Sequence, residues 1–63
     1  MLATKIKEFR IERGMTQQFL ADKLNVYRES VARWENGTSN PTMKTLTEIS
    51  RVLNQGISEF FIK

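Results

Sequence analysis

The chain carries the sequence Leu24-Asn25-Val26-Tyr27-Arg28-Glu29-Ser30-Val31-Ala32-Arg33-Trp34-Glu35-Asn36-Gly37, which predicts a tight turn followed by a short helix over about 27–36. At about 100° per residue, Val31 and Trp34 share one side of this helix. The opposite arc holds polar and small residues: Arg28, Glu29, Ala32, Arg33 and Asn36. The spacing therefore indicates one side that contacts the protein core and one side that faces outward.

Two interpretations of the outward arc stay open on this helix alone. The guanidinium groups of Arg28 and Arg33 match O6 and N7 of guanine in a DNA major groove, and Ala32 permits close approach or contact with a thymine methyl group. An ordinary solvated helix face has the same composition, with Glu29 and Arg33 forming an exposed ion pair at i and i+4.

Length and composition limit the number of domains and the kinds of site that the chain can contain. We expect 63 residues with a net charge of +3 to form a single domain over 1–63. The absence of cysteine and histidine excludes a disulfide, a thiolate or imidazole metal site and imidazole acid–base catalysis, so we expect no metal and no cofactor. The charged residues within 1–13 and the lack of a long apolar run predict an unexported, cytoplasmic protein without a membrane segment. No small-molecule ligand is evident from the sequence.

Apolar periodicity and capping residues predict the remaining helices. The first covers 3–13 and ends before Gly14. The second covers about 16–24, with Thr16 as its N-cap and Asn25 in the left-handed turn that follows. Thr42 caps a fourth helix that ends near Asn54, and a last short turn starts at 56. The short link between the second and third helices indicates a helix-turn-helix within an all-α chain.

The chain resembles the helix-turn-helix domains of lambdoid phage repressors and Cro proteins and their bacterial relatives, the Cro/C1 or Xre type. The resemblance spans nearly the whole chain and rests on these motifs, in the family's order and spacing: Ile6-x-x-Phe9-Arg10, Gly14-Met15-Thr16-Gln17, Leu20-Ala21-x-x-Leu24, Val26, Val31, Trp34-Glu35-Asn36-Gly37, Asn40-Pro41 and Leu46-x-x-Ile49. It implies a lambda-repressor-like, all-α bundle of five short helices that lays its third helix, the recognition helix, in the major groove. It also implies a homodimer bound to a pseudo-palindromic double-stranded DNA operator.

The family's base-reading positions fall on Arg28, Glu29 and Arg33, and the outward arc of the helix contains the same three residues. Ala32, from the same arc, completes the expected base-reading set. An arginine would pair with guanine, whereas Glu29 would accept a hydrogen bond from cytosine N4, orient an arginine or exclude wrong sequences. We expect contacts to DNA phosphates from residues at the start of the second helix, in the turn before the third and around the loop that follows it: Gln17, Tyr27, Asn36, Thr38, Ser39, Asn40 and Lys44. A solvated helix start and a plain surface loop would look much the same.

Other residues are expected to be structural. In the family, the positions of Arg10 and Glu35 commonly form an ion pair beneath the recognition helix. Trp34, Met15 and Met43 are interpreted as core. The last turn carries more apolar surface than one terminal turn buries without a partner or a cleft, which predicts a dimer interface made by Ile57, Phe60, Phe61 and Ile62.

Three positions depart from the family pattern. Tyr27 replaces the usual Ser or Thr that caps the recognition helix, and its phenol is our candidate for a phosphate contact instead. Phe19 replaces the glutamate of a capping box, which indicates an outward contact surface. Gln55-Gly56 replaces an apolar residue and a Ser cap before the last turn.

The sequence therefore favours a DNA-binding transcriptional regulator, with a repressor of phage or mobile-element type as the leading hypothesis. A restriction–modification controller or an antitoxin would look similar over this length. A protein-interaction module that kept the fold, with Phe19 or residues 60–62 as its contact surface, is an alternative of another class. An enzyme is disfavoured because the carboxylates are scattered singly and no nucleophile has a catalytic partner.

Overall fold

The computed structural model describes residues 2–61, which contain four α-helices and one 3-10 helix joined by short turns and loops. They are α1 (Leu2–Glu12), α2 (Gln17–Leu24), α3 (Arg28–Asn36), α4 (Met43–Val52) and the 3-10 helix η1 (Ile57–Phe61). No strand occurs within 2–61. The all-α prediction and the order of the elements are confirmed, and the fifth expected helix is the 3-10 helix.

Local chemistry accounts for the starts of α2 and α4 and for the turns that end α2 and α3. Thr16 and Thr42 have extended backbones, and their hydroxyl groups accept hydrogen bonds from the amides of Phe19 and Thr45 at 3.0 and 3.1 Å. Asn25 adopts a left-handed conformation at φ 59°, which turns the chain between α2 and α3 within a few residues. Gly37 ends α3 at φ 81°, a backbone angle that glycine adopts without strain.

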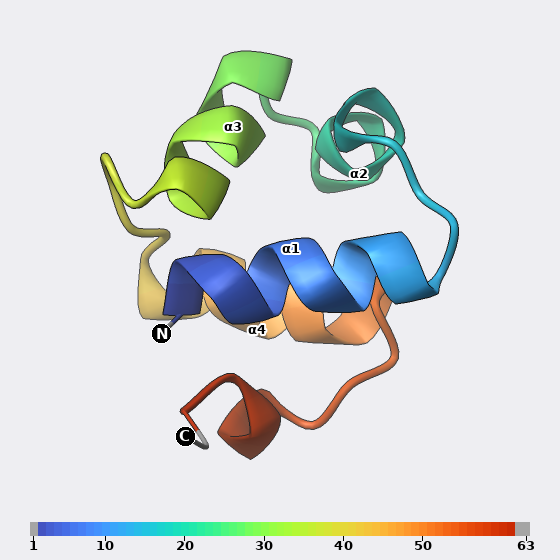
Figure 1. The fold of residues 1–63 in the computed structure, drawn as a ribbon, viewed down its shortest axis with the longest axis vertical. Helices are drawn as coiled ribbons and strands as arrows, with labels where there is room; N and C mark the ends of the chain where they lie inside the picture. Colours follow the sequence, from blue (N-terminus) through green and yellow to red (C-terminus); the bar gives the residue numbers. More distant parts are fainter. Residues whose placement is uncertain (1, 62–63) are drawn as a thin grey trace.

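The helix-turn-helix lies to one side of the molecule. In Figure 1, α1 crosses in front of α4, with α2 and α3 on one side of them and η1 on the other. α3 contacts both α1 and α2, and η1 contacts α1 and α4. This arrangement supports α3 from its inner side and leaves its outer side uncovered within the described residues.

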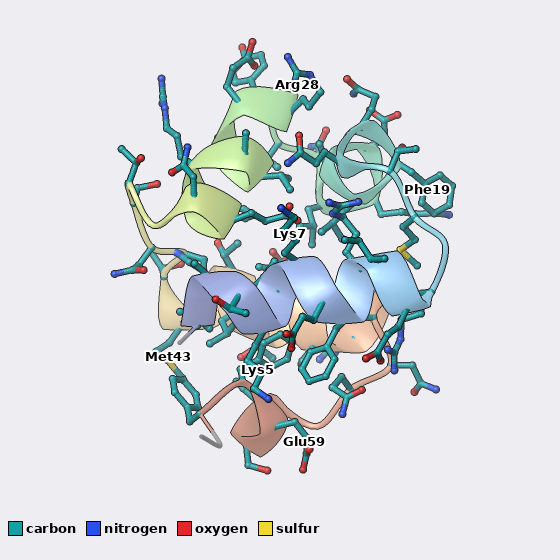
Figure 2. The ribbon with its side chains drawn as sticks, viewed as in Figure 1. Lys5, Lys7, Phe19, Arg28, Met43 and Glu59 are labelled. Carbon is teal, nitrogen blue, oxygen red and sulfur yellow. The ribbon has the colours of Figure 1, made fainter. Side chains whose placement is uncertain are left out.

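Every α-helix and η1 contribute to one apolar core. Its buried members are Ile6, Leu20, Ala21, Leu24, Val31, Trp34, Leu46, Ile49, Leu53 and Phe60. Trp34 is 7% exposed, as expected for a core residue, and Met15 packs against the same cluster. The prediction that Met43 is core is wrong because its side chain is 61% exposed. Met43 is the first residue of α4, where a helical side chain leans back past the end of the helix, and Figure 2 shows it at the edge of the molecule.

The C-terminal turn buries more of itself than the sequence indicates. Phe60 is 1% exposed and its ring meets that of Phe9 edge to face, with centroids 5.2 Å apart at 88°. The assignment of Phe60 to a dimer interface is therefore wrong, because α1 supplies the cleft that the ring needs. Ile57 is half-buried against the core, and Phe61 is 58% exposed. Ile62, the fourth residue of the expected interface, lies outside the described residues.

Candidate nucleic-acid interface

Helix α3 has two chemically distinct sides. Val31 and Trp34 are buried on its inner side. Arg28, Glu29 and Arg33 are exposed on its outer side, where Ala32 is half-buried between them. Figure 2 shows Arg28 at the start of α3, projecting away from α1. The structure thus brings the four expected base-reading residues onto one outward surface.

The charged groups of this outer side are not paired with each other. Within residues 2–61, the ion pairs join Arg10 to Glu35 and Arg13 to Glu12. Glu29 and Arg33 form no ion pair there, although their spacing permits one. The solvated-face interpretation of this arc predicted that pair, so its specific expectation is not met. Both charged groups face water, where an incoming ligand can meet them.

A hydrogen-bonded ion pair holds α3 from its inner side. Arg10 Nε donates to Glu35 Oε2 at 2.6 Å, and Arg10 Nη2 donates to Glu35 Oε1 at 3.0 Å. Arg10 Nη1 donates to the Met15 carbonyl at 2.6 Å. Arg10 retains 8% of its exposure and the Glu35 side chain 3%. The fork geometry of the guanidinium therefore ties α1, the α1–α2 turn and α3 together.

Gln17 joins this network, which sequence reasoning missed. Its Nε2 donates to Glu35 Oε1 at 3.1 Å, and the side chain is half-buried. One N–H of the amide is thus committed to the protein, and the second N–H stays available for a phosphate. The Met15 carbonyl was also missed, although the tight Gly14 turn, at φ 69°, returns the chain to Arg10 and offers a signal for it.

The loop after α3 folds back on the end of that helix. The amides of Thr38 and Ser39 donate to the Arg33 carbonyl at 3.0 and 3.3 Å. Asn36 Oδ1 accepts from the Thr38 amide at 2.8 Å and from the Thr38 hydroxyl. The Asn36 amide N–H groups are left as its outward donors. Ser39, Asn40 and Lys44 are exposed, so the expected phosphate contacts from this region all lie at the surface.

Tyr27 precedes α3 without capping it. Its backbone is extended, at φ −76° and ψ 148°, but its side chain makes no capping hydrogen bond, and 81% of the residue is exposed. The phenol therefore projects into solvent beside the first turn of α3, adjacent in sequence to Arg28.

The chemistry available at this surface is hydrogen bonding and charge. No group of three or more Cys, His, Asp or Glu residues gathers to hold a metal ion within residues 2–61. Every buried side-chain nitrogen or oxygen in that range has a hydrogen-bond partner. No helix in the described range has the length and apolar character needed to cross a membrane.

Comparison with known proteins gives consistent matches. A family model described as helix-turn-helix matches residues 6–60. An uncharacterized HTH-type transcriptional regulator from Archaeoglobus fulgidus is 43% identical over 61 residues, covering 97% of this chain and 87% of the relative.

Two solved structures share the fold at appreciable identity. The biofilm master regulator SinR of Bacillus subtilis, solved in complex with DNA, matches with a TM-score of 0.91 and 27% identity, covering 98% of this chain and all of that one. A wild-type restriction–modification controller protein matches with a TM-score of 0.83 and 37% identity, covering 95% of this chain and 78% of that one.

Proposed function

The chain belongs to the Cro/C1-type (Xre) helix-turn-helix family of DNA-binding transcription regulators, and from this membership we propose that it recognises a specific operator through the outer side of α3. The family is not an enzyme family, and we propose that this chain binds DNA in the cytoplasm as a single domain over 1–63, without catalysis or a cofactor. One observation carries this proposal: Arg28 and Arg33 are exposed on a helix packed from behind, and neither forms an ion pair within residues 2–61.

Base recognition is assigned to the outer side of α3. Arg28 and Arg33 each offer a guanidinium fork to O6 and N7 of a guanine, and each well-made pair contributes about 1–3 kcal/mol of discrimination. Glu29 accepts a hydrogen bond from cytosine N4, orients Arg33, or excludes base edges that present only acceptors, such as O6 and N7 of guanine. The small side chain of Ala32 lets α3 approach the bases closely.

Phosphate contacts position this helix in the groove. We assign them to Gln17 through its remaining N–H, to the Tyr27 phenol, and to the donors around the loop after α3: Asn36, Thr38, Ser39, Asn40 and Lys44. The backbone N–H groups at the start of α2 lie beside Gln17 and favour an anion there.

We further propose that the chain binds a pseudo-palindromic operator as a homodimer and represses transcription by occupying it. Occupancy alone can block access to a promoter, so repression requires no further surface. Phe61 is the exposed apolar side chain of η1 offered for the dimer contact, and the half-buried Ile57 lies on the same short helix. A restriction–modification controller is the second candidate, supported by the likeness to a controller protein of that kind.

Selection of bound sequences from a random double-stranded DNA pool tests the proposal. We expect two half-sites related by a two-fold axis, roughly one helical turn apart from centre to centre. Arg28→Ala and Arg33→Ala are expected to lose definition at different base positions. Arg51→Ala, which removes an exposed arginine of α4, is the matched control and should leave the selected sequence unchanged.

Two results would contradict the assignment. An unchanged consensus in both α3 variants would remove Arg28 and Arg33 from base recognition. No enriched sequence at all, with binding that fades as salt rises, would mean that only the phosphate contacts operate.

A further inference from the structure

The Gln17 amide is part of a closed hydrogen-bonded ring that joins the start of α2 to α3. Glu35 Oε1 accepts hydrogen bonds from Gln17 Nε2 at 3.1 Å and from Arg10 Nη2 at 3.0 Å. Arg10 Nε donates to the other carboxylate oxygen at 2.6 Å, and Arg10 Nη1 donates to the Met15 carbonyl at 2.6 Å. Met15 precedes Gln17 by two residues, so the backbone between them closes the ring.

This ring fixes which way the Gln17 amide faces. A carboxylate only accepts hydrogen bonds, so the amide nitrogen, and not the amide oxygen, must face Glu35. The Glu35 side chain is almost fully buried and Gln17 is half-buried, so water competes little for the contact between them. A hydrogen bond to a charged acceptor is also roughly twice as strong as one between neutral groups. The Gln17 side chain is therefore held in place before DNA arrives, with its second N–H as an outward donor.

Glu35 connects this amide to the helix that carries the outward arginines. It lies in the last turn of α3, two residues after Arg33 and seven after Arg28. A phosphate bound by the second N–H of Gln17 would thus be linked to α3 through one side chain and one hydrogen bond. N–H···O hydrogen bonds need N···O distances of about 2.7–3.2 Å, so a small rotation or shift of α3 breaks a guanidinium–guanine pair. Fixing α3 relative to a phosphate therefore limits the base sequences on which both contacts form together.

We propose that Gln17 is a positioning residue for sequence recognition, which acts through Glu35 to couple a phosphate contact at the start of α2 to base reading by α3. This inference rests on the proposed function of α3 and goes beyond a phosphate contact, which strengthens binding to every sequence alike. On unrelated DNA, base contacts do not hold α3 in register, so the coupling contributes nothing there. Removal of the Gln17 amide should therefore weaken operator binding more than binding to unrelated DNA.

A ratio of two affinities tests the coupling. Fluorescence anisotropy gives the dissociation constants for the most enriched duplex of the random-pool selection and for a scrambled duplex of the same base composition. Gln17→Ala is expected to lower the ratio of operator affinity to scrambled-duplex affinity by at least about threefold, because a hydrogen bond to a charged group is lost. A partly unfolded variant would lose both affinities by the same factor, so the ratio reports recognition and not stability.

Matched variants separate the link to α3 from the loss of a phosphate donor. Gln17→Asn keeps an amide at the start of α2 but is one methylene too short for the 3.1 Å contact, so it should lower the ratio as Gln17→Ala does. Gln18→Ala removes the neighbouring glutamine, whose amide donates to Asp22 within α2, and should leave the ratio unchanged. Lys44→Ala removes an exposed donor assigned to phosphate and should weaken binding to both duplexes by the same factor.

Failure of the coupling and failure of the proposed function give different results. Equal affinity of the parent protein for the two duplexes would contradict operator recognition itself. With recognition intact in the parent, equal weakening of both duplexes by Gln17→Ala would overturn the coupling and leave Gln17 as a plain phosphate contact. A parental ratio in Gln17→Asn would overturn it as well, because the contact with Glu35 would then be dispensable for recognition.

Discussion

Arg10 donates hydrogen bonds to Glu35 and to the Met15 carbonyl while retaining 8% exposure. Burying a charged group costs several kcal/mol of desolvation free energy unless a partner and hydrogen bonds compensate it. Here both carboxylate oxygens of Glu35 and a backbone carbonyl supply that compensation, and Gln17 adds a donor to the carboxylate. The pair holds α1, the α1–α2 turn and α3 in a fixed arrangement, so it orients α3 as well as stabilising the fold.

Removing one member of the pair should be strongly destabilising. Arg10→Ala is expected to lower the free energy of unfolding by about 3–5 kcal/mol, since Glu35 is left charged and buried. Urea unfolding followed by the fluorescence of the buried Trp34 measures the loss. Arg13→Ala is the control and should cost under about 1 kcal/mol, because its ion pair with Glu12 and its hydrogen bonds, the shortest to Gln55, are exposed. Equal losses in the two variants would contradict the structural role of Arg10.

The sequence predicts the position of a single side chain where helical spacing or the family position determines which side of a helix it lies on. The arc of Arg28, Glu29 and Arg33 follows from spacing alone, and these residues are exposed as expected. The Gln17 contact with Glu35 could not be predicted, because it depends on how α2 and α3 cross. The exposure of Met43 was misjudged since periodicity does not register that a first-turn side chain can overhang the helix end.

Among the elements, α3 begins less securely than α2 or α4. Thr16 and Thr42 cap their helices through hydroxyl oxygens, whereas Tyr27 holds the correct backbone angles and supplies no acceptor. Capping residues act locally, which explains why the sequence predicted the starts of α2 and α4. The form of η1 depends on a contact between Phe60 and Phe9, distant in sequence, and so it was beyond local prediction.

Supplying the missing cap should stabilise α3. Tyr27→Ser is expected to raise the free energy of unfolding by about 0.5–2 kcal/mol relative to Tyr27→Ala, because the hydroxyl can accept an unpaired amide of the first turn. Chemical denaturation of the two variants gives the difference. A Ser variant no more stable than the Ala variant would show that the start of α3 needs no side-chain acceptor.

The same position also bears on DNA affinity. If the phenol hydroxyl contacts a phosphate, Tyr27→Phe weakens operator binding while leaving stability nearly unchanged. Unaltered affinity in that variant would remove Tyr27 from the phosphate contacts.

At the scale of the whole molecule, η1 lies on the opposite side of α1 and α4 from the helix-turn-helix (Figure 1). The consecutive residues Phe60 and Phe61 divide two tasks between them. Phe60 joins the C-terminal segment to α1 in the core, and Phe61 faces outward. An apolar contact made through Phe61 would therefore use a surface that the core does not need.

These neighbouring phenylalanines give a matched test of stability against self-association. Phe60→Ala is expected to cost about 3–5 kcal/mol of unfolding free energy because it empties part of the core. Phe61→Ser should change stability by less than about 1 kcal/mol and shift a dimer toward monomer. Urea unfolding and sedimentation equilibrium measure the two effects. An unchanged mass distribution for Phe61→Ser, across the concentrations at which the parent dimerises, would exclude Phe61 from the interface.

The two sides of α3 also bear on how such a regulator diverges. Its inner side is fixed by Val31, Trp34 and the Glu35 network, whereas Arg28, Glu29 and Arg33 make no ion pair within the described residues. Substitutions on the outer side are therefore nearly free of folding cost. A duplicated gene can drift to a new operator through a few such changes, and each intermediate remains a folded protein on which selection can act.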